Sequence, residues 1–202
     1  MAPVDERSGG HVLISFFSGI VDEHDRVIPG GYPGGLLPLI GGRVREFSPL
    51  PPEERVRVRV HGSEVEAGVW QDDLVADRAA VLATYVDGYL QGEAAALHHE
   101  LGDGVVTYLG TLLDEAGMDR MFDTVLDEAQ VAPVLETPSG VEAAERHGAE
   151  GSYLFLLNHG QREAEITVPC GSTDLLSGGA VFAAGDTLTL QAAAVAVLKY
   201  DR

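Results

Sequence analysis

The pattern of apolar positions predicts a buried strand followed by a glycine-rich loop near the start of the chain. Residues 11–17 are apolar on both faces, which is typical of a strand inside a sheet. The chain then breaks at Ser18-Gly19, passes through a charged loop and two glycine pairs, and enters a short apolar helix at 33–40. An open α/β sheet usually presents a site on such a loop between a strand and a helix. The loop 18–32 is therefore the first candidate for function.

Strict alternation of apolar and polar residues predicts antiparallel strands further along. Residues 55–60 read Arg-Val-Arg-Val-Arg-Val, and residues 63–69 alternate again after a turn at His61-Gly62. Glu64 and Glu66 can lie opposite the arginines across this hairpin. A solvated charged face is the simpler interpretation of each single pair.

The remaining segments before residue 132 favour a mixture of strands and one helix. Residues 44–50 are interpreted as a short edge-like piece in which prolines argue against a regular element. Residues 70–74, with the only tryptophan, are interpreted as a polar connection. Strands are predicted over 79–85, 94–101 and 105–109. The spacing over 116–130 predicts an amphipathic helix. Its expected core face consists of Met118, Met121, Phe122, Val125 and Leu126.

After two prolines at 133 and 138, the pattern changes to short strands and turns. The predicted strands cover 141–146, 153–158, 163–168, 173–176, 179–182, 188–190 and 194–200. The sequence therefore predicts an α/β domain over 9–132 and a small, all-β antiparallel, sandwich-like domain over 138–202.

Composition narrows the possible partners. Hydrophobic residues make up 45% of the 202 residues, and the formal net charge is −19. Such a charge argues against nucleic acid or an anionic membrane surface as a partner. The first residues carry no apolar stretch typical of a signal peptide, and no apolar run approaches the ~20 residues of a membrane span. A cytoplasmic location is the default expectation, and the single Cys170 rules out an internal disulfide.

Candidate chemistry centres on Asp22-Glu23-His24-Asp25. This run matches neither the calcium-loop spacing nor a zinc pattern, and adjacent residues rarely converge on one substrate atom. A solvated loop is the main interpretation, and contact with a ligand is the alternative. Ser18 lacks the Gly-x-Ser-x-Gly frame of a nucleophile, and the glycines do not form a phosphate loop.

The other candidate nucleophiles and bases also lack the neighbours that catalysis would need. Cys170 has no adjacent histidine, and His98-His99 on a strand face opposite sides. The sequence thus predicts no catalytic residue, no cofactor-binding residue and no metal ligand.

Longer motifs resemble the middle domain of the family-42 glycoside hydrolases, the bacterial β-galactosidases. The resemblance runs from 17 to 27, through Gly30-Gly31-Tyr32-Pro33-Gly34, Trp70, 82–85, 102–104 and 108–111, and into the C-terminal piece at 140–142, Arg146 and 153–159. It implies a catalytic barrel, a flavodoxin-like or class I glutamine amidotransferase-like trimerisation domain, and a small β domain. This chain looks like the second and third parts. The abrupt strand at 11–17 further suggests that the first part of a larger domain is missing.

The resemblance also implies a function without catalysis in this chain. The family's two catalytic glutamates lie on barrel strands and match no position here, so the chain is expected to be inactive alone. Its expected role is homo-oligomerisation, as a trimer in the family, and support of the barrel. The parent enzyme would hydrolyse terminal β-D-galactose residues. No cofactor is expected, and the parent's linkage preference stays open.

Two alternatives remain at this point. One is a free-standing carbohydrate-binding or interaction module, although aromatic residues make up only 6% of the chain. The other is a hydrolase that uses Ser18 or Cys170. Under the resemblance, the loop 18–32 becomes a positioning loop near the barrel or a neighbouring subunit. Its candidate contact residues are Ser18, Asp22, Glu23, His24, Asp25 and Tyr32.

Overall fold

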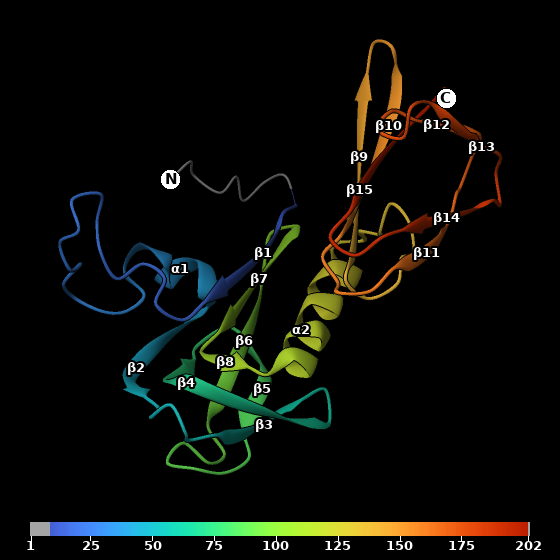
Figure 1. Cartoon of the computed structure of the whole chain (residues 1–202). Helices are drawn as coiled ribbons and strands as arrows, with labels where there is room; N and C mark the ends of the chain where they lie inside the picture. The colour runs from blue at the N-terminus through green and yellow to red at the C-terminus, as the bar shows by residue number, and fades with distance from the viewer. Residues whose placement is uncertain (1–8, 202) are drawn as a thin grey trace. The chain divides into compact units, whose positions relative to one another are not determined.

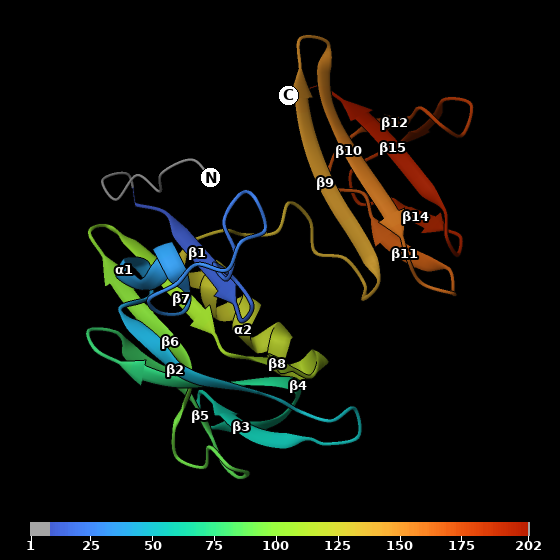
Figure 2. The same ribbon diagram turned by 90° about the vertical axis from the view of Figure 1, so that its left-hand side faces the viewer.

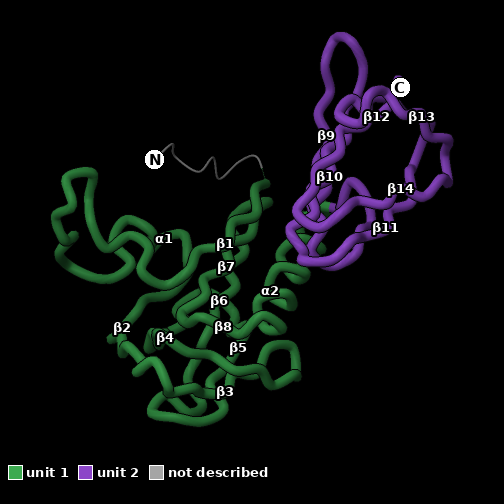
Figure 3. The backbone as a smooth tube through the Cα atoms, viewed as in Figure 1, with its two compact units in different colours: residues 1–131 green, residues 132–202 purple. Residues whose placement is uncertain are grey.

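The computed structural model describes residues 9–201 and divides the chain into two units (Figure 3). Unit 1 covers residues 1–131, and unit 2 covers residues 132–202. Each unit has its own apolar core. No helix among residues 9–201 is long and apolar enough to cross a membrane.

Unit 1 is built mainly from strands (Figure 1). In chain order its elements are β1 (His11–Ser15), a 3-10 turn (Gly34–Leu36), α1 (Leu37–Ile40), β2 (Gly42–Pro49), β3 (Val56–Val60), β4 (Ser63–Ala76), β5 (Ala80–Tyr85), β6 (Ala94–Leu101), β7 (Gly104–Leu109), β8 (Thr111–Leu113) and α2 (Glu115–Glu128). The strands form one sheet in the order β1-β7-β6-β5-β3-β4-β2, and β8 pairs with β4. The long strand β4 also pairs with β6.

The prediction of a flavodoxin-like or amidotransferase-like α/β domain is wrong. Among the described strands of unit 1, only β1 and β7 pair in parallel, and α1 has just four residues. The physical reason lies in the short turns. His61-Gly62, with both residues at positive φ, and the tight turn around Gly102 can join only antiparallel neighbours, whereas parallel strands need a long crossover. These hairpins dominate the sheet, and the single strand, loop and helix at the start does not repeat.

Two further segments of unit 1 differ from the prediction. Residues 44–50 lie largely within β2, an edge strand, where Pro49 at the end of the strand is tolerated. Residues 70–74 belong to β4 and are no connection. The predicted helix is confirmed as α2, which Asp114 caps by accepting a hydrogen bond from the Gly117 amide.

The expected core face of α2 is confirmed only in part. Met121 is fully buried and Met118 packs against the main core. Phe122 and Leu126 are 47% and 43% exposed. The helix thus contacts the sheet along a narrower stripe than its apolar spacing predicts.

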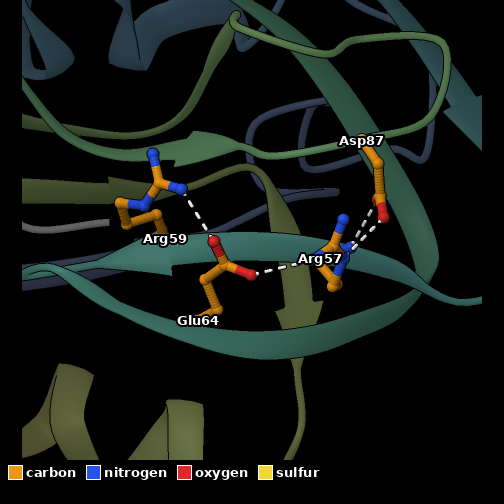
Figure 4. A network of polar contacts seen from close by, with 4 residues as sticks. All are labelled: Arg57, Arg59, Glu64 and Asp87. Carbon is orange, nitrogen blue, oxygen red and sulfur yellow. Dashed lines mark hydrogen bonds and ion pairs between the residues drawn. The ribbon is translucent and has the colours of Figure 1, made fainter.

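The charged hairpin between β3 and β4 forms a network of ion pairs (Figure 4). Glu64 pairs with Arg57 at 2.9 Å and with Arg59 at 2.7 Å, and Arg57 also pairs with Asp87. In the strand register Arg57 lies opposite Glu66 and Arg59 lies opposite Glu64, as the alternation allowed, and Glu64 forms the ion pairs. All four side chains are well exposed, so these pairs contribute little to stability.

Unit 2 consists of two antiparallel sheets (Figure 2). Its strands are β9 (Val141–Gly148), β10 (Gly151–Asn158), β11 (Ala164–Thr167), β12 (Ser172–Asp174), β13 (Ala180–Phe182), β14 (Thr187–Leu190) and β15 (Val195–Tyr200), close to the predicted positions. Five of them form one sheet in the order β13-β12-β15-β10-β9, and β11 pairs with β14. Buried Asn158 donates to the carbonyls of Leu190 and Gln191, which joins the end of β10 to the end of β14.

Candidate functional site

The loop 18–32 folds back on itself as a small hairpin between β1 and α1 (Figure 1). The Ile28 amide donates to the Ile20 carbonyl at 2.9 Å, and Val21 bridges to Val27. Close packing fixes the base of the loop, because a Cβ on Gly34 would lie 2.5 Å from the Gly19 carbonyl oxygen. The loop is therefore a defined structure.

Asp22 organises the tip of this hairpin. Its Oδ1 accepts hydrogen bonds from the amides of His24 and Arg26, at 2.8 and 3.1 Å. Its Oδ2 accepts one from the Arg26 guanidinium at 2.9 Å. These bonds, the His24 amide first, hold the pKa of the Asp22 carboxyl below its ordinary value. Asp22 is thus used in shaping the loop.

The other three residues of the candidate run at the tip are exposed to solvent. Glu23, His24 and Asp25 are all exposed. The possible ligand atoms of Asp22, Glu23 and His24 lie within 4.8 Å of one another. Since Arg26 and the loop amides already occupy both Asp22 oxygens, this cluster gives no argument for a metal site.

Ser18 and Tyr32 lie at the base of the loop. Half-buried Ser18 lines an open hollow of about 660 Å³ beside β1, together with Ile14, Leu36 and Leu39. The Tyr32 hydroxyl accepts a hydrogen bond from the Phe17 amide at 2.6 Å. The six candidate residues of the loop therefore divide between its exposed tip and its base.

A buried polar network lies beneath the base of the loop. Asp72, on β4, is fully buried, and its carboxylate accepts hydrogen bonds from the Trp70 indole at 2.8 Å and the Tyr108 hydroxyl at 2.7 Å. Tyr32 packs against the same apolar cluster as Tyr108. The loop is thereby connected to the centre of the sheet through Tyr32, Tyr108 and Asp72.

Burial dominates the ionisation of this network. Both donors to Asp72 are uncharged, and burial raises the pKa of its carboxyl to about 6. Burial also raises the pKa of the Tyr108 hydroxyl, and the adjacent Asp72 carboxylate raises it further. Burial and the Asp72 carboxylate also raise the pKa of the Tyr32 hydroxyl, burial being the larger cause.

Aromatic rings gather around Trp70 on this side of the sheet. The Phe47 ring stacks on Trp70 with centroids 4.9 Å apart, and Phe17 meets it edge-on at 4.6 Å. Phe16 stacks at 5.9 Å, and Tyr32 meets Phe47 at 6.0 Å. Trp70 is buried under these rings, whereas Phe17 and Phe47 are 59% and 53% exposed.

Sequence reasoning missed the cluster because two bulges interrupt the alternation. The pairing of β4 with β8 shifts between Gly68 and Gln71, and the pairing of β2 with β4 shifts at Arg45. The second bulge places Phe47 opposite Asp72. The usable signal was the alternation of Trp70, Asp72 and Leu74, all three of which are buried.

The remaining candidate nucleophile and bases lie in surroundings typical of residues that serve packing. A ring nitrogen of buried His99 lies 2.7 Å from the Leu39 carbonyl oxygen. His98 is half-buried on the same strand. Burial raises the pKa of the Cys170 thiol, with Glu145 adding to the effect, which disfavours the thiolate. None of these three side chains has the environment of an activated nucleophile or base.

Comparison with known proteins matches both units to known domain families. Residues 6–132 match the β-galactosidase trimerisation domain, and residues 140–200 match the β-galactosidase C-terminal domain. The chain belongs to glycoside hydrolase family 42. The resemblance stated from its motifs is thereby confirmed.

Individual members of family 42 match over most of this chain. A β-galactosidase of Arthrobacter sp. is 36% identical over 96% of the chain, and β-galactosidase LacZ of Heyndrickxia coagulans is 39% identical over 75%. The crystal structure of β-galactosidase from Bacillus circulans sp. alkalophilus superposes on 95% of the chain with a TM-score of 0.82 and 31% identity.

This family 42 chain spans only about a quarter of its relatives. It covers 26% of the Arthrobacter protein, 23% of LacZ and 29% of the crystallised protein. It corresponds to their trimerisation and C-terminal domains.

Proposed function

We propose that this chain assembles with copies of itself and thereby holds the catalytic barrels of a family 42 β-galactosidase together. The match of residues 6–132 to the trimerisation domain carries the proposal. A trimer is the proposed state, and hydrolysis of terminal β-D-galactose is the proposed activity of the whole enzyme. The proposed location is the cytoplasm.

We also propose that the loop 18–32 contacts the barrel or a neighbouring subunit. The loop projects from unit 1 as an ordered hairpin, and Glu23, His24 and Asp25 are exposed at its tip (Figure 1). Ser18 and Tyr32 would fix its base while Asp22 shapes its tip. An ordered, exposed hairpin loses little conformational freedom when it binds.

Sedimentation equilibrium of the full chain tests the assembly. The expected result is a reversible equilibrium that approaches three times the chain mass as concentration rises. A strict monomer at every concentration would contradict the proposal.

A chromogenic β-galactoside tests the absence of catalysis. No hydrolysis by the purified chain is expected, because family 42 catalysis requires two carboxylates on the barrel. Measurable hydrolysis that persists through repeated purification would overturn this assignment.

A further inference from the structure

The aromatic side chains around Trp70 form an exposed apolar surface. We call Phe16, Phe17, Tyr32, Phe47 and Trp70 the Trp70 patch. Its members come from the segment between β1 and α1, from β2 and from β4. Phe17 and Phe47 are each more than half exposed. Large apolar side chains gathered in this way typically mark a protein interaction site.

An open hollow of about 550 Å³ adjoins the patch. Its apolar lining includes Ile20, Val27, Ile28, Tyr32 and Phe47. The hollow can receive an apolar side chain from a partner beside the exposed Phe47 ring. Aromatic rings next to such a pocket are the usual centre of binding energy in interfaces.

Part of the patch is fixed before any partner arrives. The Trp70 indole is fixed by its hydrogen bond to buried Asp72, and the Phe17 backbone amide is fixed by the Tyr32 hydroxyl. Because the Trp70 side chain and the Phe17 backbone are already ordered, less conformational freedom is lost on docking.

Backbone strain is concentrated at the same place. Phe17 has φ 66° and Val69 has φ 69°. A β-branched residue such as valine rarely adopts this left-handed conformation. Such strain persists only where the surroundings over-determine it, and it gathers at functional sites.

The match to a trimerisation domain makes a second copy of the chain the occupant to consider, and charge decides where two copies can meet. Two copies with a net charge of −19 repel each other, so they can meet with least cost where the surface is uncharged. None of the five patch residues is charged at neutral pH. At the rim, Arg45 forms a two-bond pair with Asp73, and Glu46 is exposed. An apolar aromatic centre with a polar rim is the common anatomy of a protein interface.

We propose, given the self-association proposed above, that a second copy of this chain docks on the Trp70 patch. Phe47 and Phe17 are the central contacts. The hollow beside Phe47 receives an apolar side chain of the other copy.

Two substitutions in the full chain test this docking. Phe47→Asp places a charge at the centre of the patch. Phe17→Gly removes the other ring and relieves the positive φ, so it keeps a test available if the first variant folds poorly. Val81→Asp is the matched control, because Val81 is 49% exposed on β5 and lies outside the patch. Circular dichroism checks that each variant is folded.

Sedimentation equilibrium gives the deciding measurement. Phe47→Asp and Phe17→Gly should each raise the dissociation constant of self-association by about tenfold or more, and Val81→Asp should leave it unchanged. Trp70 is the only tryptophan, so its emission should change with concentration at the same midpoint as the mass.

The possible failures are distinguishable. If the wild-type chain associates and both patch variants associate equally well, the patch is not the contact, while the proposed self-association stands. If the wild-type chain stays monomeric, self-association itself fails and the docking fails with it. Emission that responds to galactose and not to protein concentration would assign the patch to a sugar and overturn the proposal.

Discussion

Asp72 is the residue that connects the loop, the aromatic patch and the sheet. It is fully buried, and its partners, Trp70 and Tyr108, are neutral donors. A buried carboxylate without a cationic partner is costly when it is ionised. Its position is nevertheless useful, because both oxygens fix aromatic side chains at the base of the patch.

Replacing Asp72 by asparagine should flatten the pH dependence of stability. Burial raises the pKa of the Asp72 carboxyl from 3.8 to about 6, so the folded state holds this proton more tightly than the unfolded state does. The stabilisation from this group is complete below about pH 4 and is lost as pH rises through about 6. The free energy of unfolding of wild type minus that of Asp72→Asn should therefore fall by up to about 3 kcal/mol between about pH 4 and pH 7.

Urea denaturation at several pH values measures this difference. Asp25→Asn, at the exposed tip of the loop, is the control for a change of one charge. Parallel pH profiles for wild type and Asp72→Asn would show that the carboxyl does not titrate in this way.

At the scale of elements, α2 depends on Asp114 in two ways. The Asp114 carboxylate caps the helix by accepting from the Gly117 amide, and its second oxygen accepts from the Glu66 amide on β4. Asp114→Ala removes both bonds and should lower the free energy of unfolding by about 1–2 kcal/mol. Asp119→Ala makes the same chemical change at an exposed position within α2 and should have little effect or a slightly stabilising one. Equal losses in the two variants would argue against the capping role.

The elements also show what the sequence could predict. Alternation and short turns located the β3–β4 hairpin and the strands of unit 2, and helical spacing located α2, because these depend on local pattern. The α/β prediction failed because it extended one local strand, loop and helix to a whole domain. The patch was missed for a different reason. Bulges at Arg45 and next to Val69 set which side chains meet, and such irregularities depend on pairing between distant segments.

At the scale of the whole molecule, assembly must overcome charge repulsion. Each copy carries a formal charge of −19, and exposed ion pairs such as Glu64 with Arg57 are satisfied within one copy. An interface centred on the uncharged Trp70 patch would gain little from charge pairing between copies. Its strength would come from burial of aromatic surface, opposed by the long-range repulsion of two acidic molecules.

This balance predicts that added salt strengthens self-association. Salt screens the repulsion between copies, while it leaves the burial of apolar rings intact or favours it. The dissociation constant from sedimentation equilibrium should therefore fall as sodium chloride is raised from low to moderate concentration at constant pH. The Val81→Asp control should follow the same trend. If salt weakened assembly instead, the contact would have to rest on ion pairs between copies. In that case the rim around Arg45 and Glu46, or another charged surface, would replace the aromatic patch as the place where the copies meet.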